Sequence, residues 1–102
     1  MKTCITCGMP LEGAHAGDIG LETAEGLVCK YDVKDGAIKS ADEIYEGGVM
    51  FFMKVADGDR GLAERITRKN MKSLPHWQNN PFDALNGPEA TDEEFGMAMS
   101  KL

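Results

Sequence analysis

The stretch CITCGMPL at residues 4–11 contains two cysteines separated by two residues and followed by a glycine. One tight turn can present both sulfurs of such a pair to a single metal ion, as zinc knuckles do. A glycine at position 8 can adopt a positive φ and let backbone amides point toward the thiolates. The stretch therefore predicts one half of a metal site, with Cys4 and Cys7 as ligands.

The stretch CKYD at residues 29–32 repeats this spacing with a carboxylate in the last place. Carboxylate oxygen is an accepted zinc ligand. We therefore expect Cys4, Cys7, Cys29 and Asp32 to hold one structural metal ion, with zinc as the expected cofactor. Thiolate-rich sites of this kind also accept iron, so the spacing alone leaves iron open. Three thiolates and one carboxylate carry more negative charge than a divalent cation can neutralise. This excess charge predicts that backbone donors and Lys30 or Lys34 lie nearby.

Other readings of these residues stay open at this point. The fourth ligand could be His15, which is a better zinc donor than a carboxylate but sits in a glycine-flanked loop, or a water molecule. The site could also hold no metal. A thioredoxin-like role for Cys4 and Cys7 needs a βαβ context and a helix N-terminus, whereas Gly-Met-Pro-Leu follows the pair here.

Residues 1–36 are rich in glycine and predict a small hairpin. Short apolar runs at 19–23 and 27–30 indicate two strands, and Ala24-Glu25-Gly26 between them indicates a tight loop. Asp35-Gly36 is a second turn signal. A hairpin of this size is marginal alone in water, so a metal ion would support it.

Helical periodicity begins after the second turn. Ser40 and Glu43 form a capping box, and apolar spacing predicts a helix over 40–56 that contains Gly47-Gly48 as a close-packing surface or a kink. The apolar run 49–53 is expected to pack in the core, and the alternative is a partner surface, because methionine-rich faces adapt to partners. A second helix is expected over 62–73, ending before Pro75, with an i,i+4 pair between Glu64 and Arg68.

The remaining segments continue the helical body. Trp77 is expected to close the core beneath the two helices. Thr91-Asp92-Glu93-Glu94 is a second capping box, so residues 79–102 form either a docked terminal helix or an acidic tail that orders on binding.

The chain has 102 residues and a net charge of −6. This charge disfavours bulk nucleic-acid binding, which needs Lys and Arg to neutralise phosphates. Residues 59–78 are the exception, with five basic and two acidic residues, and predict a solvated helix face that could serve for docking. The sequence has no apolar run of membrane-spanning length and no secretory signal, so we expect a cytoplasmic protein that does not enter the membrane.

The quoted motifs resemble those of the zinc-ribbon domain family, which opens with Cys-x-x-Cys-Gly-Met-Pro and carries a second Cys-x-x-Cys some twenty residues later. Asp35-Gly36, the Phe-Met segment at 51–53 and Pro75-His76-Trp77 follow in the matching order, so the resemblance covers residues 3–78. It implies zinc binding by the three cysteines. The family's fourth cysteine is matched here by Asp32, so that ligand does not carry over as such.

These observations predict an α+β fold in three parts. Residues 1–36 form zinc-ribbon knuckles and a hairpin, residues 37–78 form a two-helix body of the same domain, and residues 79–102 form the acidic tail. No catalytic triad, phosphate loop or carboxylate pair points to an enzyme. We expect an interaction or regulatory module with an unidentified protein partner, which is the kind of accessory role that the resemblance also implies. The alternative is a metal-handling or thiol-redox protein with a labile three-cysteine site.

Overall fold

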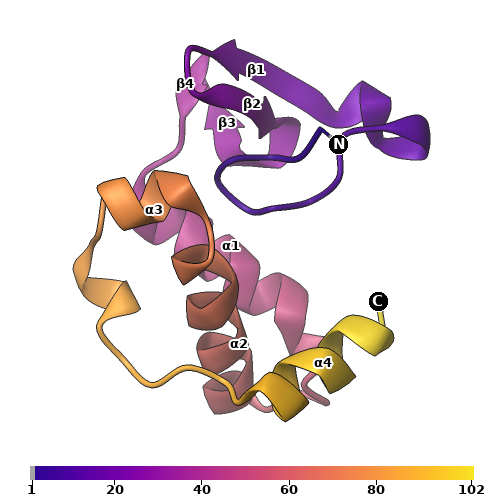
Figure 1. Cartoon of the computed structure of the whole chain (residues 1–102), viewed down its shortest axis with the longest axis vertical. Helices are drawn as coiled ribbons and strands as arrows, with labels where there is room; N and C mark the ends of the chain where they lie inside the picture. The colour runs from indigo at the N-terminus through magenta and orange to yellow at the C-terminus, as the bar shows by residue number, and fades with distance from the viewer. Residues whose placement is uncertain (1) are drawn as a thin grey trace.

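The computed structural model describes residues 2–102 and has a ribbon of short strands at one end and helices at the other (Figure 1). The predicted α+β class is confirmed. The division of the chain at residues 36 and 78 stays a prediction, and Met1 lies outside the described residues. Along the chain the elements are three 3-10 helices at Gly13–Asp18, Lys30–Asp32 and Asp83–Leu85, strands β1 Ile19–Thr23, β2 Gly26–Cys29, β3 Val33–Lys34 and β4 Ala37–Ile38, and helices α1 Ala41–Met53, α2 Arg60–Lys72, α3 Pro75–Asn79 and α4 Asp92–Ser100.

Strands β1 and β2 form the predicted antiparallel hairpin, with Thr23 opposite Gly26. Gly26 has a positive φ of 141°, which suits the tight loop expected at residues 24–26. The second strand ends at Cys29, one residue earlier than predicted, because residues 30–32 turn into a 3-10 helix. A Cβ at Gly20 would lie 2.5 Å from the Lys30 Cα, so the absence of a side chain there lets β1 lie against the start of this turn.

A second, smaller hairpin joins β3 to β4 through the predicted turn at Asp35-Gly36. Asp35 has φ 53° and Gly36 has φ 78°. Two positive φ angles in succession are what a type I′ hairpin turn requires, and its twist suits the flanking strands. This hairpin leads the chain directly into α1.

Helix α1 begins as predicted at the Ser40 capping box, in which Ser40 and Glu43 satisfy each other's backbone amides. The helix ends at Met53 rather than at residue 56. Gly48 is the close-packing position: a Cβ there would lie 2.9 Å from the Thr67 Cγ2 of α2. The expectation that residues 49–53 all pack in the core was wrong in part, because Met50 and Phe51 are 63% and 47% exposed.

Helix α2 begins at Arg60, two residues earlier than predicted, because the Asp59 side chain accepts a hydrogen bond from the Leu62 amide and caps it. The predicted pair between Glu64 and Arg68 was wrong. Glu64 pairs with Arg60 at 3.4 Å, which leaves Arg68 free to reach elsewhere in the fold.

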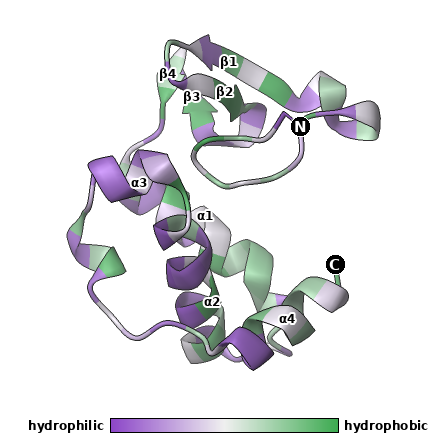
Figure 2. Ribbon diagram, viewed as in Figure 1, coloured by the Kyte–Doolittle hydropathy of each residue, from purple (hydrophilic) through white to green (hydrophobic). Residues whose placement is uncertain are grey.

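Residues 79–102 lie along the basic face of α2, which is strongly hydrophilic (Figure 2). Arg68 donates to the carbonyls of Ala84 and Pro88, at 2.8 and 3.3 Å. Lys69 pairs with Asp92 at 2.8 Å and Lys72 pairs with Glu89 at 3.0 Å. The predicted solvated face of α2 therefore meets the acidic segment of the same chain, and of the two alternatives for this segment the structure has the docked helix, α4.

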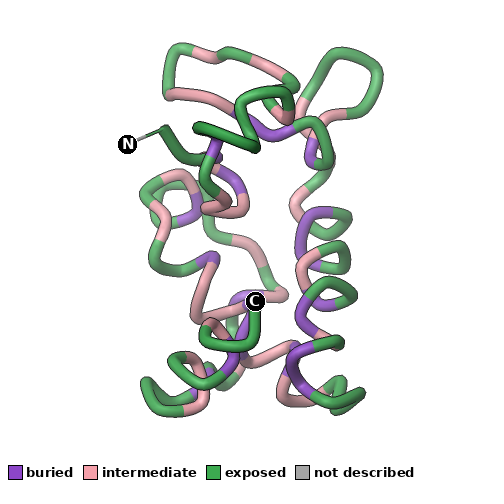
Figure 3. Tube along the Cα trace, turned by 90° about the vertical axis from the view of Figure 1, so that its right-hand side faces the viewer, coloured by how far each residue is buried: buried purple, intermediate pink, exposed green. Residues whose placement is uncertain are grey.

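The buried residues form two clusters, one among the helices and one in the ribbon (Figure 3). One lies among the helices and includes Trp77, which closes the core as expected. The other lies in the ribbon, where Cys4, Leu11, Val28 and Cys29 are buried and seven partly buried hydrophobic residues pack against them. Two of the four buried members of this cluster are cysteines. Within residues 2–102, every helix is too short or too polar to cross a bilayer.

Candidate metal centre

The first knuckle is a closed turn between Cys4 and Met9. The Gly8 amide donates to the Cys4 carbonyl at 2.8 Å, and the Cys4 amide donates to the Met9 carbonyl at 2.9 Å. Gly8 has φ 79°, the positive value that the sequence predicts. Its amide therefore closes the turn and does not face the thiolates, which is where the glycine in this position had predicted that backbone amides would point.

The second knuckle begins where β2 ends. Cys29 is the last residue of the strand and is buried, and the 3-10 turn that follows carries Asp32 back toward the same point. The Asp32 carbonyl accepts from the Lys39 amide at 2.8 Å, which fixes the turn to the chain that enters α1. The Cys-x-x-Asp spacing thus works as a knuckle, with the carboxylate where the second thiol would stand.

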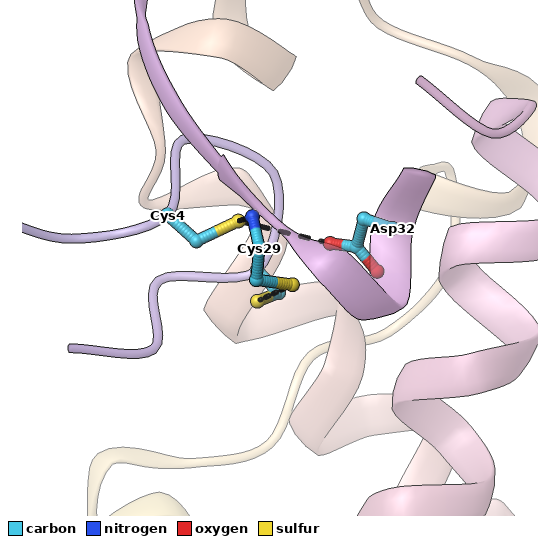
Figure 4. A group of neighbouring side chains, drawn as sticks. Cys4, Cys29 and Asp32 are labelled. Carbon is cyan, nitrogen blue, oxygen red and sulfur yellow. Dashed lines mark hydrogen bonds between the residues drawn. The ribbon is translucent and has the colours of Figure 1, made fainter. Parts of the chain in front are cut away.

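The two knuckles meet, and the four predicted ligands come together. One ligand atom each from Cys4, Cys7, Cys29 and Asp32 lies within 4.8 Å of all the others. The Cys7 and Cys29 sulfurs are 3.6 Å apart, and the Cys4 sulfur is 3.8 Å from Asp32 Oδ2 (Figure 4). Ligands about 2.0–2.3 Å from a tetrahedral ion are about 3.3–3.8 Å from one another. These two edges therefore have the length that one tetrahedral ion needs.

The three cysteines are free thiols. The separation of 3.6 Å between the Cys7 and Cys29 sulfurs is far longer than a disulfide bond of about 2.05 Å. The sulfurs lie at the distance expected of shared ligands. The donor set of three soft sulfurs and one oxygen fits a zinc ion.

Neutral donors surround the cluster. The buried Thr6 hydroxyl donates to Asp32 Oδ2 at 2.7 Å and lies 3.0 Å from the Cys4 sulfur. The Cys29 amide donates to the same sulfur at 3.2 Å. Such hydrogen bonds orient ligands and spread their negative charge. Thr6 was not singled out from the sequence, although its place inside the Cys-x-x-Cys turn is a signal that could have identified it.

The four groups compete for protons because they are so close. Hydrogen bonds from Cys29 and Cys7 hold the pKa of the Cys4 thiol far below its ordinary value. The hydrogen bond to Cys29 raises the pKa of Cys7 strongly, and the hydrogen bond to Cys4 raises the pKa of Cys29 to about 12. Burial raises the pKa of Asp32. Full ionisation of all four groups therefore needs a cation among them, and its binding would release protons.

The helical body braces the first knuckle through two side chains. Asn70 of α2 donates from its amide to the Cys7 carbonyl at 2.9 Å. Trp77 of α3 donates from its indole nitrogen to the Thr6 carbonyl, also at 2.9 Å. Both donors come from more than sixty residues away along the chain, so the ribbon and the helices share one hydrogen-bonded junction beside the cluster.

The other candidate residues lie elsewhere. His15 Nδ1 is 3.0 Å from Asp18 Oδ2 on the exposed side of the ribbon, and His15 does not belong to the group that gathers within 4.8 Å. Lys30 pairs with Asp18 at 3.1 Å, and Lys34 lies 3.9 Å from Glu43. The expected lysine near the cluster is thus engaged with other carboxylates, and the donors observed there are uncharged.

In a comparison with known protein families, a family model described as a putative zinc ribbon domain matches residues 3–78. This range contains both knuckles, the two hairpins, α1, α2 and Trp77. No curated protein and no solved structure matches the chain.

Proposed function

The chain belongs to the family of putative zinc ribbon domains, and we propose that Cys4, Cys7, Cys29 and Asp32 bind one structural zinc ion. The observation that carries this proposal is the convergence of their four ligand atoms within 4.8 Å. The carboxylate favours zinc over an iron–sulfur centre, because zinc accepts mixed sulfur and oxygen ligands whereas such clusters are held mainly by cysteine thiolates.

The role of this zinc ion is to stabilise the ribbon. The ribbon core has four buried members, two of which are proposed metal ligands, and its other apolar residues are only partly buried. Zinc binding to small zinc-finger peptides contributes about 10–16 kcal/mol, most of which is folding free energy. In this proposal the ribbon folds on the metal and presents the helices in a fixed orientation through Asn70 and Trp77.

The protein itself acts as a non-enzymatic interaction or regulatory module in the cytosol, with a protein as its partner. The cytosolic setting is supported by the free thiols, which a reducing compartment maintains. Nucleic acid is disfavoured as a partner, since Arg65, Arg68, Lys69 and Lys72 of the basic segment already contact residues 84–94. The partner therefore docks on the helical body or on the C-terminal segment without relying on these charges.

A second candidate function is metal handling or thiol chemistry at a labile site. One observation favours it: Cys7 and Asp32 line a cavity of the protein, so these two ligands are within reach of small molecules. In that case Asp32 would leave the metal readily and a thiol-containing ligand would replace it.

Removal of the metal ion distinguishes between a structural zinc site and a labile one. The zinc-loaded protein is treated with a chelator while the amide spectrum of the ribbon and the helical circular dichroism are followed together. A structural site loses zinc slowly, and the ribbon resonances between residues 2 and 38 collapse as the metal leaves. Rapid loss of zinc with an unchanged ribbon spectrum would instead support the labile site.

A further inference from the structure

A cavity of about 730 Å³ lies between the ribbon and the helices. Its walls come from the first knuckle and from α1, α2 and the C-terminal end of the chain. Binding sites for small organic molecules occupy about 300–1,000 Å³, so this volume suits one such molecule. The cavity adjoins the metal centre, since Cys7 and Asp32 contribute to its lining.

Most of the lining is apolar, and part of it is exposed. Phe51 of α1, Tyr31 of the second knuckle and Leu102 at the chain end line the cavity while being 47%, 58% and 58% exposed. Three large apolar side chains from distant parts of the sequence thus share one concave surface. A bound apolar group would remove them from water.

Gly47 keeps this space open. It lies inside α1 and lines the cavity, yet a Cβ at this position would meet no atom within 4 Å. Glycine in a helix interior costs about 0.5–1 kcal/mol relative to alanine. Gly48 next to it has a packing reason in its contact with Thr67, whereas Gly47 has none in the folded chain.

The polar lining is acidic. Asp18, Asp32 and His15 are its titratable groups besides Cys7 and Tyr31, and the described lining contains no lysine or arginine. Lys30 offsets the charge of Asp18 through their 3.1 Å pair. Asp32 belongs to the proposed zinc site, in which three thiolates and one carboxylate carry more negative charge than a divalent ion neutralises. The excess charge of this cluster is a second source of negative charge at the cavity, and it rests on the proposed zinc site.

We propose that the cavity binds a small amphiphilic amine, with its apolar body against α1 and the chain end and its ammonium group toward Asp32 and Thr6. The apolar walls supply affinity and the acidic end selects the charge of the head group. A carboxylate head of the same length would face like charge. An alcohol would keep the apolar contacts without the ionic one.

The test is a titration of the full-length, zinc-loaded protein with octylammonium, octanoate and 1-octanol, followed by amide chemical shifts. Octylammonium is expected to bind saturably, with shifts at Gly47, Phe51 and Tyr31, and at least about tenfold more tightly than octanoate. Gly47→Phe fills the cavity and should abolish binding. Gly47→Ala leaves room for the probe and serves as the matched control.

A second variant keeps the test independent of packing in α1. Leu102→Lys changes an exposed terminal side chain and places a cation at the cavity, so it should weaken octylammonium binding and improve octanoate binding. Equal binding of the three probes would indicate an unselective apolar surface for a protein partner and would overturn the proposal, as would unchanged binding in Gly47→Phe. Zinc content is measured on every sample, so absence of zinc counts against the metal site while head-group selectivity reports on the cavity.

Discussion

The side-chain amide of Asn70 donates a hydrogen bond of 2.9 Å to the carbonyl oxygen of Cys7. Helix α2 thereby holds the first knuckle of the ribbon through the backbone carbonyl of a proposed zinc ligand. The contact converts a small metal-binding turn and a helical body into one unit. It also explains why a polar side chain lies on the inner face of α2.

Replacement of Asn70 by alanine is expected to weaken zinc binding about tenfold, because partners that hold metal ligands in place contribute to affinity. The measurement is competition against a chromophoric chelator. Asn80→Ala is the matched control, since Asn80 makes a comparable 2.8 Å bond to the His76 carbonyl away from the cluster. Equal zinc affinities of both variants and the parent protein would show that the brace does not act on the metal site.

Position 32 offers a direct test of ligand identity. Asp32→Cys restores the family's fourth thiol and is expected to hold zinc at least about tenfold more tightly, whereas Asp32→Asn removes the anionic ligand and should lose affinity by a similar factor. Chelator competition gives the three affinities. If aspartate, cysteine and asparagine are equivalent at this position, Asp32 is not a ligand.

The two adjacent glycines of α1 are expected to respond in opposite directions to alanine. Gly47→Ala should stabilise the protein by about 0.5–1 kcal/mol, because its Cβ enters open space and the helix gains propensity. Gly48→Ala should destabilise it, because its Cβ would lie 2.9 Å from Thr67 Cγ2. Urea denaturation of both variants measures the difference. A gain in stability at Gly48 would contradict the close packing of α1 on α2.

Arg68 is expected to fasten the C-terminal segment. Arg68→Ala removes the donor to the carbonyls of Ala84 and Pro88 and should cost about 1–3 kcal/mol, with faster hydrogen exchange of amides between residues 83 and 90. Arg60→Ala is the control, since its partners Glu46 and Glu64 lie on the two helices and are exposed or half-buried. Unchanged exchange in Arg68→Ala would mean that the segment is held by its apolar contacts alone.

The convergence of Cys4, Cys7, Cys29 and Asp32 could be predicted from the sequence. Two knuckles of equal spacing indicate that these side chains meet, whereas their binding of a metal ion stays a prediction. Capping boxes at Ser40 and Thr91 located two helix starts, because the interaction is local and is completed within four residues.

Contacts between distant segments could not be read in this way. Arg68 was assigned to Glu64 by helical spacing, yet its guanidinium finds two carbonyls sixteen and twenty residues away. Phe51 was assigned to the core because the run around it is apolar, but its side of α1 faces the cavity. Both errors come from contacts between segments that are distant in the sequence.

The central claim is tested most directly by native mass spectrometry of the purified full-length protein. We predict a single species carrying one zinc ion per chain. Its mass should fall below the summed masses of the metal-free protein and one zinc ion, because the thiols lose protons when they bind the metal. The metal should be lost when the protein is sprayed from acid. A folded protein that carries no metal, or iron in place of zinc, would contradict a structural zinc site built by Cys4, Cys7, Cys29 and Asp32.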